Sequence, residues 1–391
     1  MKEKLKTAWG IFGIALFLIV TLEALSNLLI HIKNSISPSV DFNFVGKEYA
    51  EADWTQGYLR EHNASFRLEW HPYIYWRRRP FQGKYIRINE RGIRRTWNPT
   101  ASGGVPFEKT IKIFMFGGSA LWGTGARDDF TIPSHLARIL AQKEGLPVQV
   151  TNFGESGYVS TQEVISLWLE LRNGSQPDLV IFYDGTNDTY SSFQNQEAGI
   201  PENEFNREKE FNLLNETRRP DLYQSAFSSL TSSGLYRLFR SVYRRATGQS
   251  GIGVFPHRQI PVEKTDPLAG ETLQVYQSNI ERVQEMAHSF GFKALFYWQP
   301  ALFTKKSKTS YESQKEKEMQ LVESFYLKVE SLLKKSSLLG NPNFHDISDL
   351  FDEEPEFYFI DFCHTTERGN EQIAARMSRD VIPLLKGGAS S

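Results

Sequence analysis

The sequence has a single cysteine, Cys363, in 391 residues. One thiol cannot form an intramolecular disulfide, and one cysteine is too few for a zinc or iron–sulfur site built on cysteine ligands. An excess of either charge is also lacking, because 45 lysines and arginines stand against 46 aspartates and glutamates, a net charge of -1. We therefore expect no nucleic-acid partner. The chain does have 40% hydrophobic residues, enough for one sizeable core or two smaller ones.

The common phosphate-binding loops are missing as well. The stretch FMFGGSALWGTG, residues 114–125, follows an apolar alternation and contains two glycine clusters. A P-loop requires a lysine and then serine or threonine after its last glycine, and a dinucleotide fingerprint requires G-x-G-x-x-G; neither spacing fits. The nucleophile elbow G-x-S-x-G fails because Leu121 occupies the place of its last glycine. Ser119, at the end of a predicted strand, needs a different explanation.

The amino terminus carries a long apolar run, from Ala8 to Ile32. A bilayer core needs about 20 apolar residues as helix, so we predict a transmembrane anchor at Trp9 to Leu29, within a first segment of residues 1–34. Lysines at positions 2, 4 and 6 precede the run, whereas acidic residues outnumber lysines after it. This bias predicts a cytoplasmic amino terminus, with the rest of the chain in the periplasm or at the cell surface.

Two other interpretations of the run are weaker. A cleaved signal peptide has a shorter apolar region and a small-x-small cleavage site, and this sequence has neither. A buried core helix needs a polar side toward solvent, yet no charged residue lies between Trp9 and Leu22. Glu23 lies in the second half of the run, where a carboxyl group can sit near the outer interface or face a partner helix.

Residues 35–109 form the second predicted segment, which is rich in aromatic residues and arginines. The alternation around Gly83 and Gly92 predicts a short β-rich lead-in packed on the main domain. Basic and aromatic residues interleave there: Arg77, Arg78, Arg79, Lys84, Arg87, Arg94 and Arg95 with Tyr73, Trp76, Tyr85 and Trp97. Such an array can form a platform for a sugar polymer or for anionic headgroups. We favour a hairpin whose charged residues simply face water, because charge runs are usually solvated.

From Thr110 onwards strands alternate with helical segments, which is typical of a parallel sheet covered by helices. The predicted strands are Ile111 to Phe116, Val148 to Asn152, Leu179 to Tyr183, Lys293 to Trp298 and Phe344 to Ile347. The predicted helices are Ile132 to Glu144, Gln162 to Arg172, Glu271 to Ser289, Glu316 to Lys335 and Glu367 to Val381. Ligand sites in such sheets lie at the carboxyl ends of the strands, which is where Ser119 falls.

Polar motifs follow three later elements of this pattern. NFGESGY follows the second strand, DGTND follows the third, and DFCHTTERGNEQIA leads into the last helix. Together with the GGS of residues 117–119, these ordered blocks resemble the SGNH hydrolase superfamily, or GDSL esterases and lipases, of the membrane-anchored bacterial type. The resemblance covers about Thr110 to Leu385. It implies a flavodoxin-like three-layer α/β/α sandwich with a five-stranded parallel sheet, in a catalytic domain of residues 110–391.

The resemblance assigns roles to five residues. Ser119 matches the nucleophile, although GGS replaces the family's G-D-S; Gly157 matches the glycine of the second block and Asn187 the asparagine of the third. Asp361 and His364 match the D-x-x-H of the last block. The backbone N–H groups of Ser119 and Gly157 and the Asn187 amide would form the oxyanion hole. No metal or organic cofactor is implied.

These residue types suit acyl transfer on physical grounds. A serine hydroxyl is a weak nucleophile until a nearby base takes its proton, and histidine is the side chain suited to that role near neutral pH. His364 is the candidate base. Asp361 precedes it closely enough to reach the other ring nitrogen, which would fix the tautomer and stabilise the imidazolium. The negative charge that develops on the carbonyl oxygen requires preorganised donors.

Each of these residues also has a structural alternative. Ser119 can cap a helix, Gly157 can serve a turn, Asn187 can hold an Asx turn, and Asp361 can cap the following helix. Their placement after successive strands and before the final helix favours catalysis over four separate structural roles.

Two further residues compete for a chemical role. His345 lies within a predicted strand, where residues mainly pack, so we expect it to be structural. Cys363 adjoins His364; we expect its side chain to point elsewhere and, without a base of its own, not to act as a nucleophile.

Residues 189–266 interrupt the strand–helix rhythm as a long insertion, of a length typical of a lid, a binding loop or a partner surface. Within it, GLYRLFRSVYRR places Leu235, Leu238, Phe239 and Val242 on one helical side, and Arg237, Arg240, Arg244 and Arg245 mostly on another. A basic amphipathic helix beside a membrane anchor can lie on the lipid surface. A lid helix packed on the core with solvated arginines is an equally good interpretation.

We expect a membrane-anchored serine esterase or O-acyltransferase with an acyl-enzyme on Ser119. Anchoring, the aromatic lead-in and the resemblance to anchored members that add or remove acetyl groups favour acetyl esters of a cell-surface or exported glycan as substrate. A lipase or thioesterase acting on lipid acyl esters is the first alternative. The second is a non-catalytic accessory subunit of a membrane acyltransferase or polysaccharide export complex, with Glu23 and the insertion as partner contacts; the complete residue set argues against it.

Overall fold

The computed structural model describes residues 2–36, 49, 52–99, 110–216, 233–247, 260–353 and 355–387. The chain divides into two compact units. The smaller comprises Met1–Val40 and Phe205–His257, and the larger comprises Asp41–Glu204 and Arg258–Ser391.

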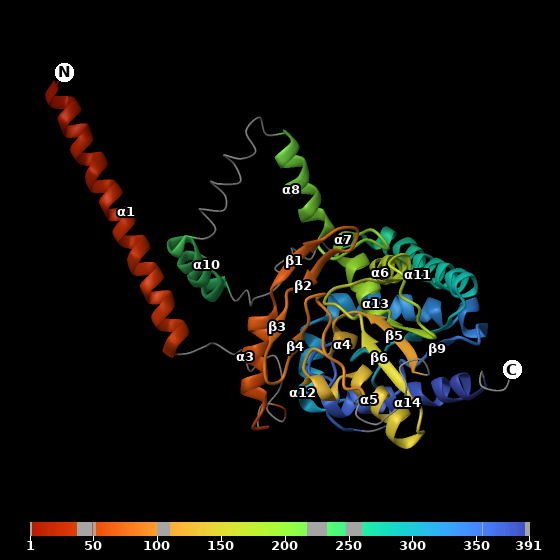
Figure 1. The fold of residues 1–391 in the computed structure, drawn as a ribbon. Coiled ribbons are helices and arrows are strands. Elements are labelled where there is room, and N and C mark those ends of the chain that lie inside the picture. Colours follow the sequence, from red (N-terminus) through yellow and green to blue (C-terminus); the bar gives the residue numbers. More distant parts are fainter. Residues whose placement is uncertain are drawn as a thin grey trace. The chain divides into compact units, whose positions relative to one another are not determined.

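A five-stranded parallel sheet forms the centre of the larger unit (Figure 1). Its strands are β5 (Ile111–Gly117), β6 (Val148–Asn152), β7 (Leu179–Asp184), β8 (Lys293–Trp298) and β9 (Phe344–Asp346). They lie in the order β6-β5-β7-β8-β9, and each neighbouring pair is parallel. This is the 2-1-3-4-5 order of the flavodoxin-like fold. The predicted fold class is therefore confirmed, and the predicted strand ends differ from the observed ones by at most one residue.

Alternate residues of the central strands enter two separate cores, because successive side chains of a strand point to opposite faces. On one face Phe116 and Phe182 pack with residues of the helices α6, α11 and α13. On the other face Met115 and Ile181 pack with residues of α5 and α14. Figure 1 shows α6 and α11 above the sheet and α5 and α14 below it. The result is the predicted three-layer arrangement.

The helices of the larger unit follow the predicted pattern, with three differences. Their bounds are α3 (Thr55–Ser65), α4 (Ser119–Trp122), α5 (Ile132–Arg138), α6 (Ser160–Arg172), α7 (Thr186–Asn195), α11 (Val262–Phe290), α12 (Ser310–Lys317), α13 (Gln320–Leu333) and α14 (Glu367–Lys386). Three short turns of helix are η4 (Asp128–Phe130), η5 (Ile139–Lys143) and η6 (Ser337–Gly340).

The differences have local causes. The helix predicted from Glu316 to Lys335 is two helices, because a capping box at Thr309 starts α12 early and the chain turns at Met319 before α13. The helix after β5 and η4 ends in a π-helical turn, η5. Helix α11 begins at Val262, well before the predicted start, and accommodates Pro267.

The lead-in contains more than the predicted β structure. Helix α3 precedes two antiparallel hairpins, β1 (Leu68–His71) with β2 (Tyr75–Arg78) and β3 (Phe81–Gln82) with β4 (Arg87–Ile88). The expectation that its charged residues face water is wrong for three of them, because Arg77, Arg78 and Arg94 are buried.

In the smaller unit the described elements are helices. The apolar helix α1 (Lys2–Ile36) contains a stretch, Trp9–Ile30, that is long and apolar enough to cross a membrane. Helix α10 (Gly234–Thr247) packs against α1. Helix α8 (Glu204–Glu216) lies within the predicted insertion, and all of it after Glu204 belongs to the smaller unit. The remaining insertion positions, 217–232 and 248–259, lie outside the described residues.

Candidate active site

Ser119 is the first residue of the short helix α4, directly after the carboxyl end of β5. The preceding Gly118 leaves room for another part of the site: a β-carbon at this position would lie 2.1 Å from Nδ2 of Asn187. Any larger residue at position 118 would therefore require the Asn187 amide to move. The sequence therefore turns from strand to helix at a glycine and presents the serine hydroxyl at the edge of the sheet where ligands of this fold bind.

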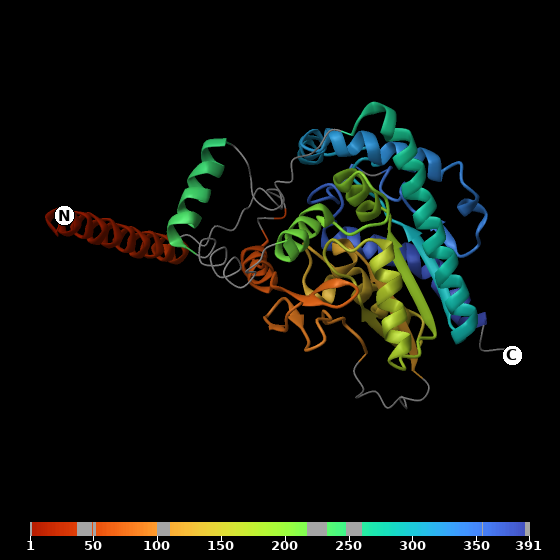
Figure 2. The same ribbon diagram turned by 90° about the horizontal axis from the view of Figure 1, so that it is seen from above.

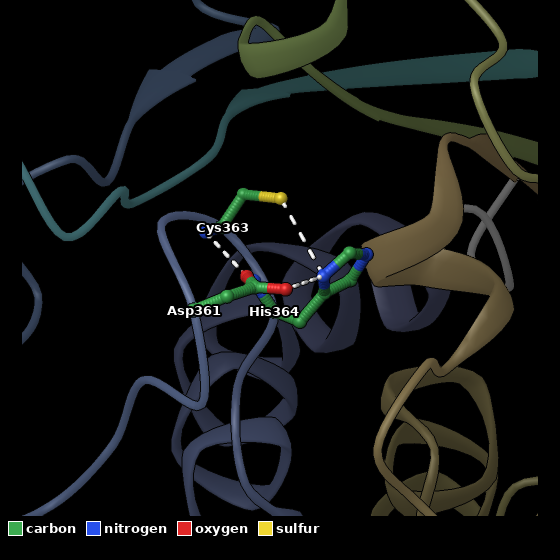
Figure 3. A group of neighbouring side chains, drawn as sticks. All are labelled: Asp361, Cys363 and His364. Atoms are coloured by element: carbon green, nitrogen blue, oxygen red, sulfur yellow. Dashed lines mark hydrogen bonds and ion pairs between the residues drawn. The ribbon is translucent and has the colours of Figure 1, made fainter. Parts of the chain in front are cut away.

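A tight loop between Ile360 and Thr365 brings Asp361 and His364 to the same place (Figure 3). Asp361 Oδ1 accepts the backbone N–H groups of Cys363 and His364, at 2.9 and 2.8 Å, and so fixes the loop. Asp361 Oδ2 lies 2.6 Å from His364 Nδ1, and His364 Nε2 lies 2.7 Å from Ser119 Oγ. Three side chains separated by up to 245 positions thus form one hydrogen-bonded chain.

The Asp361 carboxylate is held in its charged form. Burial by itself would raise its pKa, but the adjacent His364 and the backbone N–H groups of Cys363 and His364 outweigh burial and lower the pKa below its ordinary value. A permanently charged carboxylate at Nδ1 favours the imidazole tautomer whose Nε2 can accept the Ser119 proton.

Cys363 is placed differently from the expectation. Its sulfur does not point away from His364 but lies 3.7 Å from Nδ1, because the turn at Asp361 brings consecutive side chains together. Burial raises the pKa of this thiol well above its usual range, and the nearby Asp361 and Glu202 carboxylates raise it further. A thiol that stays protonated is a poor nucleophile, so the geometry leaves that role to Ser119.

Asp361, Cys363 and His364 also offer ligand atoms within 4.8 Å of one another, the spacing of a possible metal site. The atoms are already engaged, however. Nδ1 of His364 faces the aspartate at hydrogen-bond distance, and the other aspartate oxygen accepts two backbone N–H groups. These hydrogen bonds explain why the three side chains lie close together: Asp361 orients His364.

Gly157 lies on the loop after β6, and Asn187 is the second residue of α7, directly after β7. Gly157 has φ +74°, a left-handed conformation that favours glycine. The Asn187 amide donates from Nδ2 to the carbonyl of Tyr158 at 2.8 Å, which fixes the side chain. An amide NH₂ carries two hydrogens, so one remains for a ligand.

The buried arginines of the lead-in support the nucleophile helix, which the sequence interpretation missed. The guanidinium carbons of Arg78 and Arg94 lie over the ring of Trp122, 3.7 and 4.2 Å from its centroid. Arg94 also donates to the carbonyls of Trp122 and Gly123, at 3.1 and 2.7 Å, where α4 ends. The last turn of this very short helix is therefore capped from the lead-in.

Each arginine is paired with a buried acid. Arg78 Nε lies 3.3 Å from Glu155 on the loop after β6, and Arg94 Nε lies 2.9 Å from Asp128. The interleaved aromatic and basic residues of the lead-in were the only sign of these buried ion pairs in the sequence. The acidic partners could not be identified from it, because they are distant along the chain.

A second missed support holds the loop of Asp361. The carboxylate of Glu312, on α12, accepts the N–H groups of Tyr358 and Phe359, both at 3.1 Å. The same carboxylate pairs with the buried Lys305 at 2.7 Å. Hydrogen bonds to Glu312 thus fix the segment before the Asp361–His364 loop to helix α12.

The remaining candidate histidine packs within the fold. His345, on β9, stacks on the ring of Tyr297 with centroids 5.1 Å apart, and its Nδ1 lies 3.7 Å from Asp380. Burial lowers its pKa.

Residues 113–377 match the sequence model of the GDSL-like lipase/acylhydrolase family. The chain belongs to this family. The match covers the sheet, the loops that carry Ser119, Gly157 and Asn187, and the loop of Asp361 and His364. The resemblance inferred from the four blocks is confirmed, and with it the assignment to the GDSL esterases and hydrolases.

Solved structures with similar chains include other members of this group. A lipase, Lip_vut3, from a goat rumen metagenome is 12% identical, with 69% of this chain and 97% of that chain covered and a TM-score of 0.40. The acetyl xylan esterase AlAXEase is 14% identical, with 69% and 100% covered and a TM-score of 0.36. Est24, a carbohydrate acetylesterase from Sinorhizobium meliloti, is 13% identical, with 70% and 99% covered and a TM-score of 0.37. No curated protein matches this GDSL chain.

Proposed function

We propose that this GDSL protein is a membrane-anchored serine esterase or O-acyltransferase that acts on acetyl esters of a cell-surface or exported glycan. The observation that carries the proposal is the hydrogen-bonded chain from Asp361 through His364 to Ser119. It has the distances that general-base activation of a serine requires.

In the first half of the reaction Ser119 Oγ attacks the ester carbonyl while His364 Nε2 takes the hydroxyl proton. The C=O electrons move onto oxygen, where the N–H groups of Ser119 and Gly157 and the Asn187 amide stabilise the negative charge. The intermediate collapses, the ester C–O bond breaks, and the departing sugar hydroxyl receives the proton from His364. An acyl group remains on Ser119.

In the second half His364 removes a proton from the acceptor, which attacks the acyl carbonyl. The bond between the acyl carbon and Ser119 Oγ then breaks, and His364 returns the proton to Oγ. Water as acceptor releases acetate, and a sugar hydroxyl as acceptor produces a new ester. Both reactions restore the free Ser119 and use the same residues, so access of the acceptor decides between hydrolysis and transfer.

Exposed aromatic residues on a hairpin that contacts the Gly157 loop support a glycan substrate. The β1–β2 hairpin carries Trp70 and Tyr73, which are 67% and 68% exposed. Large exposed apolar side chains mark contact surfaces. The same hairpin reaches the site loop, because Trp76 Nε1 donates to the carbonyl of Ser156, the neighbour of Gly157, at 2.9 Å. A sugar polymer lying along the hairpin would present its acetyl groups near Ser119.

The apolar stretch of α1 supports a membrane anchor, and the lysines that precede it support a cytoplasmic amino terminus with the catalytic unit outside the cytoplasm. In that compartment exported glycans are accessible as ester substrates, and a membrane acyltransferase is a suitable partner for supplying acetyl groups.

The test is acyl release by the detergent-solubilised full chain from acetyl and octanoyl aryl esters and from an O-acetylated xylan. We expect acetyl turnover that Ser119→Ala abolishes. Ser175→Ala is the matched control, because Ser175 precedes β7 at the opposite end of the sheet. Preference for octanoyl esters would support the lipase or thioesterase alternative, and a folded protein without turnover would support the accessory subunit.

The glycan assignment has its own test. Trp70→Ala and Tyr73→Ala should raise KM for acetylated xylan and leave KM for the aryl acetate unchanged. An equal KM for xylan in the variants and the unaltered protein would remove the hairpin as a glycan platform.

A further inference from the structure

The second half of the anchor contains an acidic residue that a membrane would normally disfavour. Glu23 lies within the stretch Trp9–Ile30. An unpaired carboxylate at that depth is costly, and intramembrane acidic residues accordingly have partners. Here the partner is the start of α10. Glu23 accepts hydrogen bonds from Ser233 Oγ at 2.7 Å and from the N–H groups of Gly234 and Leu235 at 2.5 and 3.0 Å.

The contact between the two helices is specific in shape as well as charge. A β-carbon at Gly234 would lie 2.7 Å from Cγ of Asn27, one turn beyond Glu23, so glycine lets the Asn27 amide approach the start of α10. Asn27 Nδ2 donates to Glu23 Oε1 at 2.9 Å, and Asn27 Oδ1 accepts from Arg237 at 2.6 Å. The carboxylate meets the positive end of the α10 dipole and the unpaired N–H groups of its first turn, which together favour a negative charge.

Helix α10 is strongly two-sided. Leu235, Phe239 and Val242 are 40%, 67% and 59% exposed and recur at the spacing of one helical face. In the sequence, arginines stand at positions 237, 240, 244 and 245, which helical periodicity separates from these apolar positions, and tyrosines stand at positions 236 and 243. Apolar residues on one side, arginines on the other and tyrosines between them are the composition of helices that lie in a membrane interface.

We propose that α10 is a membrane-interface helix, pinned to the anchor by Glu23, whose apolar face enters the outer leaflet and whose arginines bind anionic lipid headgroups. The occupant of the exposed apolar face is the same membrane that α1 crosses. In the view of Figure 2, α10 crosses the direction of α1, and the two helices pack against each other.

The depth of the contact agrees with this position. Glu23 precedes the end of the stretch, Ile30, by seven residues, about 10 Å at 1.5 Å per residue. Interfacial helices bury their apolar face by about 5–10 Å. The start of α10 is therefore held at the depth where such helices lie. This inference rests on the proposed membrane anchoring and not on the proposed esterase chemistry.

The test uses the full chain in nanodiscs of phosphatidylcholine with or without phosphatidylglycerol. A fluorophore that responds to polarity is attached to a cysteine introduced by Val242→Cys, by Arg244→Cys or, within the anchor, by Leu16→Cys. The native Cys363 is buried, so the unaltered chain measures background labelling. We expect lipid-borne quenchers to quench the labels at 242 and 16, more strongly at 242 with phosphatidylglycerol, and an aqueous quencher to quench the label at 244.

Each other result is decisive. Lipid quenching at 16 with only aqueous quenching at 242 overturns the interface position while leaving the anchor intact. A label at 242 shielded from both quenchers shows a helix packed on protein, such as a lid, and also overturns the proposal. A label at 16 that is exposed to water removes the anchor and, with it, the proposal. Equal quenching at 242 with and without phosphatidylglycerol overturns the anionic preference.

Glu23→Ala tests whether the hydrogen bonds of Glu23 hold α10 against the anchor. We expect lipid quenching at 242 to fall to the level seen at 244, with aryl acetate turnover unchanged. Thr21→Ala is the matched control, because Thr21 bonds within α1 to the carbonyl of Phe17. Undiminished lipid quenching at 242 in Glu23→Ala would show that Glu23 does not hold α10 at the membrane.

Discussion

At the scale of single residues, Asp361 uses its two oxygens for different tasks. Oδ1 accepts the N–H groups of Cys363 and His364 and shapes the loop, whereas Oδ2 faces His364 Nδ1. Asparagine can keep the first task, because its carbonyl oxygen accepts, and cannot perform the second, because its NH₂ group only donates. Asp361→Asn should therefore keep the structure of the loop while removing the bond that orients the histidine.

Asp361→Asn should lower kcat for an aryl acetate by roughly 10³ to 10⁴ at neutral pH, because the imidazole adopts the wrong tautomer. KM and the melting temperature should change little. Steady-state kinetics and thermal unfolding of the two proteins measure these quantities. A loss of less than about tenfold would show that the carboxylate is not required for the base.

Asn187→Ala addresses the proposed oxyanion hole. Loss of one donor should lower kcat by roughly 10² to 10³ with KM almost unchanged, because the amide acts on charge that develops in the transition state. Asn195→Ala, at the far end of the same helix, is the control, since the Asn195 amide donates to Ser191 and Pro201 nearby in the chain. If both variants lose the same activity, helix α7 and not the amide explains the effect.

The candidate residues could be found from the sequence because each follows an element whose pattern is clear. The aspartate and histidine are close in the chain, and the serine, glycine and asparagine follow strands that end at one edge of the sheet. The position of the Cys363 sulfur could not be found, because it depends on how Asp361 turns the loop.

At the scale of elements, the alternating strands and helices predicted a parallel sheet covered by helices, but the lead-in was predicted less well. Its arginines alternate with aromatic residues, a pattern that fits both a solvated hairpin and buried ion pairs. The deciding partners are distant: Glu155 lies 77 positions after Arg78, and Asp128 lies 34 after Arg94. Sequence periodicity reports local faces and carries no information about such long-range pairs.

Arg94→Met should lower the free energy of unfolding by about 3–5 kcal/mol, because it leaves Asp128 buried without its partner. Three backbone carbonyls at the end of α4 and in the following turn lose their donor as well. Arg95→Met is the control: its partner Asp129 is exposed, and loss of such a surface pair costs about 0.2–1 kcal/mol. Denaturant unfolding measures both.

Adding Asp128→Asn to Arg94→Met should restore part of the lost stability, since it removes the unpaired charge. The double variant should still show a lowered kcat, because α4, which presents Ser119, lacks its cap. Full recovery of kcat together with stability would show that Arg94 does not position the nucleophile.

At the scale of the whole molecule, buried titratable groups limit stability at both ends of the pH range. Burial, with the charges of Arg78 and Arg94, lowers the pKa of His62 to about 3, and burial lowers that of His135 to about 4. In the unfolded chain a histidine binds its proton near pH 6.5. Below that value the unfolded state takes up protons that the folded state does not, so stability falls as the pH drops from about 6.5 toward 4.

The acidic pair Glu163 and Asp184 acts in the opposite direction. Burial raises the pKa of both carboxyl groups well above their ordinary values, and nearby negative charges, including that of Asp188, raise them further. The unfolded groups lose their protons near pH 4, whereas the folded groups keep theirs to higher pH. Stability contributed by the protonated pair is complete below pH 4 and is lost progressively as the pH rises toward the folded pKa values.

Glu163→Gln removes one of these titrations while keeping the shape and a neutral side chain. The stability of the variant relative to the unaltered protein should therefore increase with pH above about 5, by up to about 1.4 kcal/mol per pH unit while the folded glutamic acid stays protonated. Denaturant unfolding of both proteins from pH 5 to 8 measures the difference. His62→Gln should show the reverse trend, a relative gain only below about pH 6.5. A stability difference for Glu163→Gln that does not vary with pH would mean that Glu163 has the same pKa in both states, and Glu163 would then have no part in the pH dependence of folding.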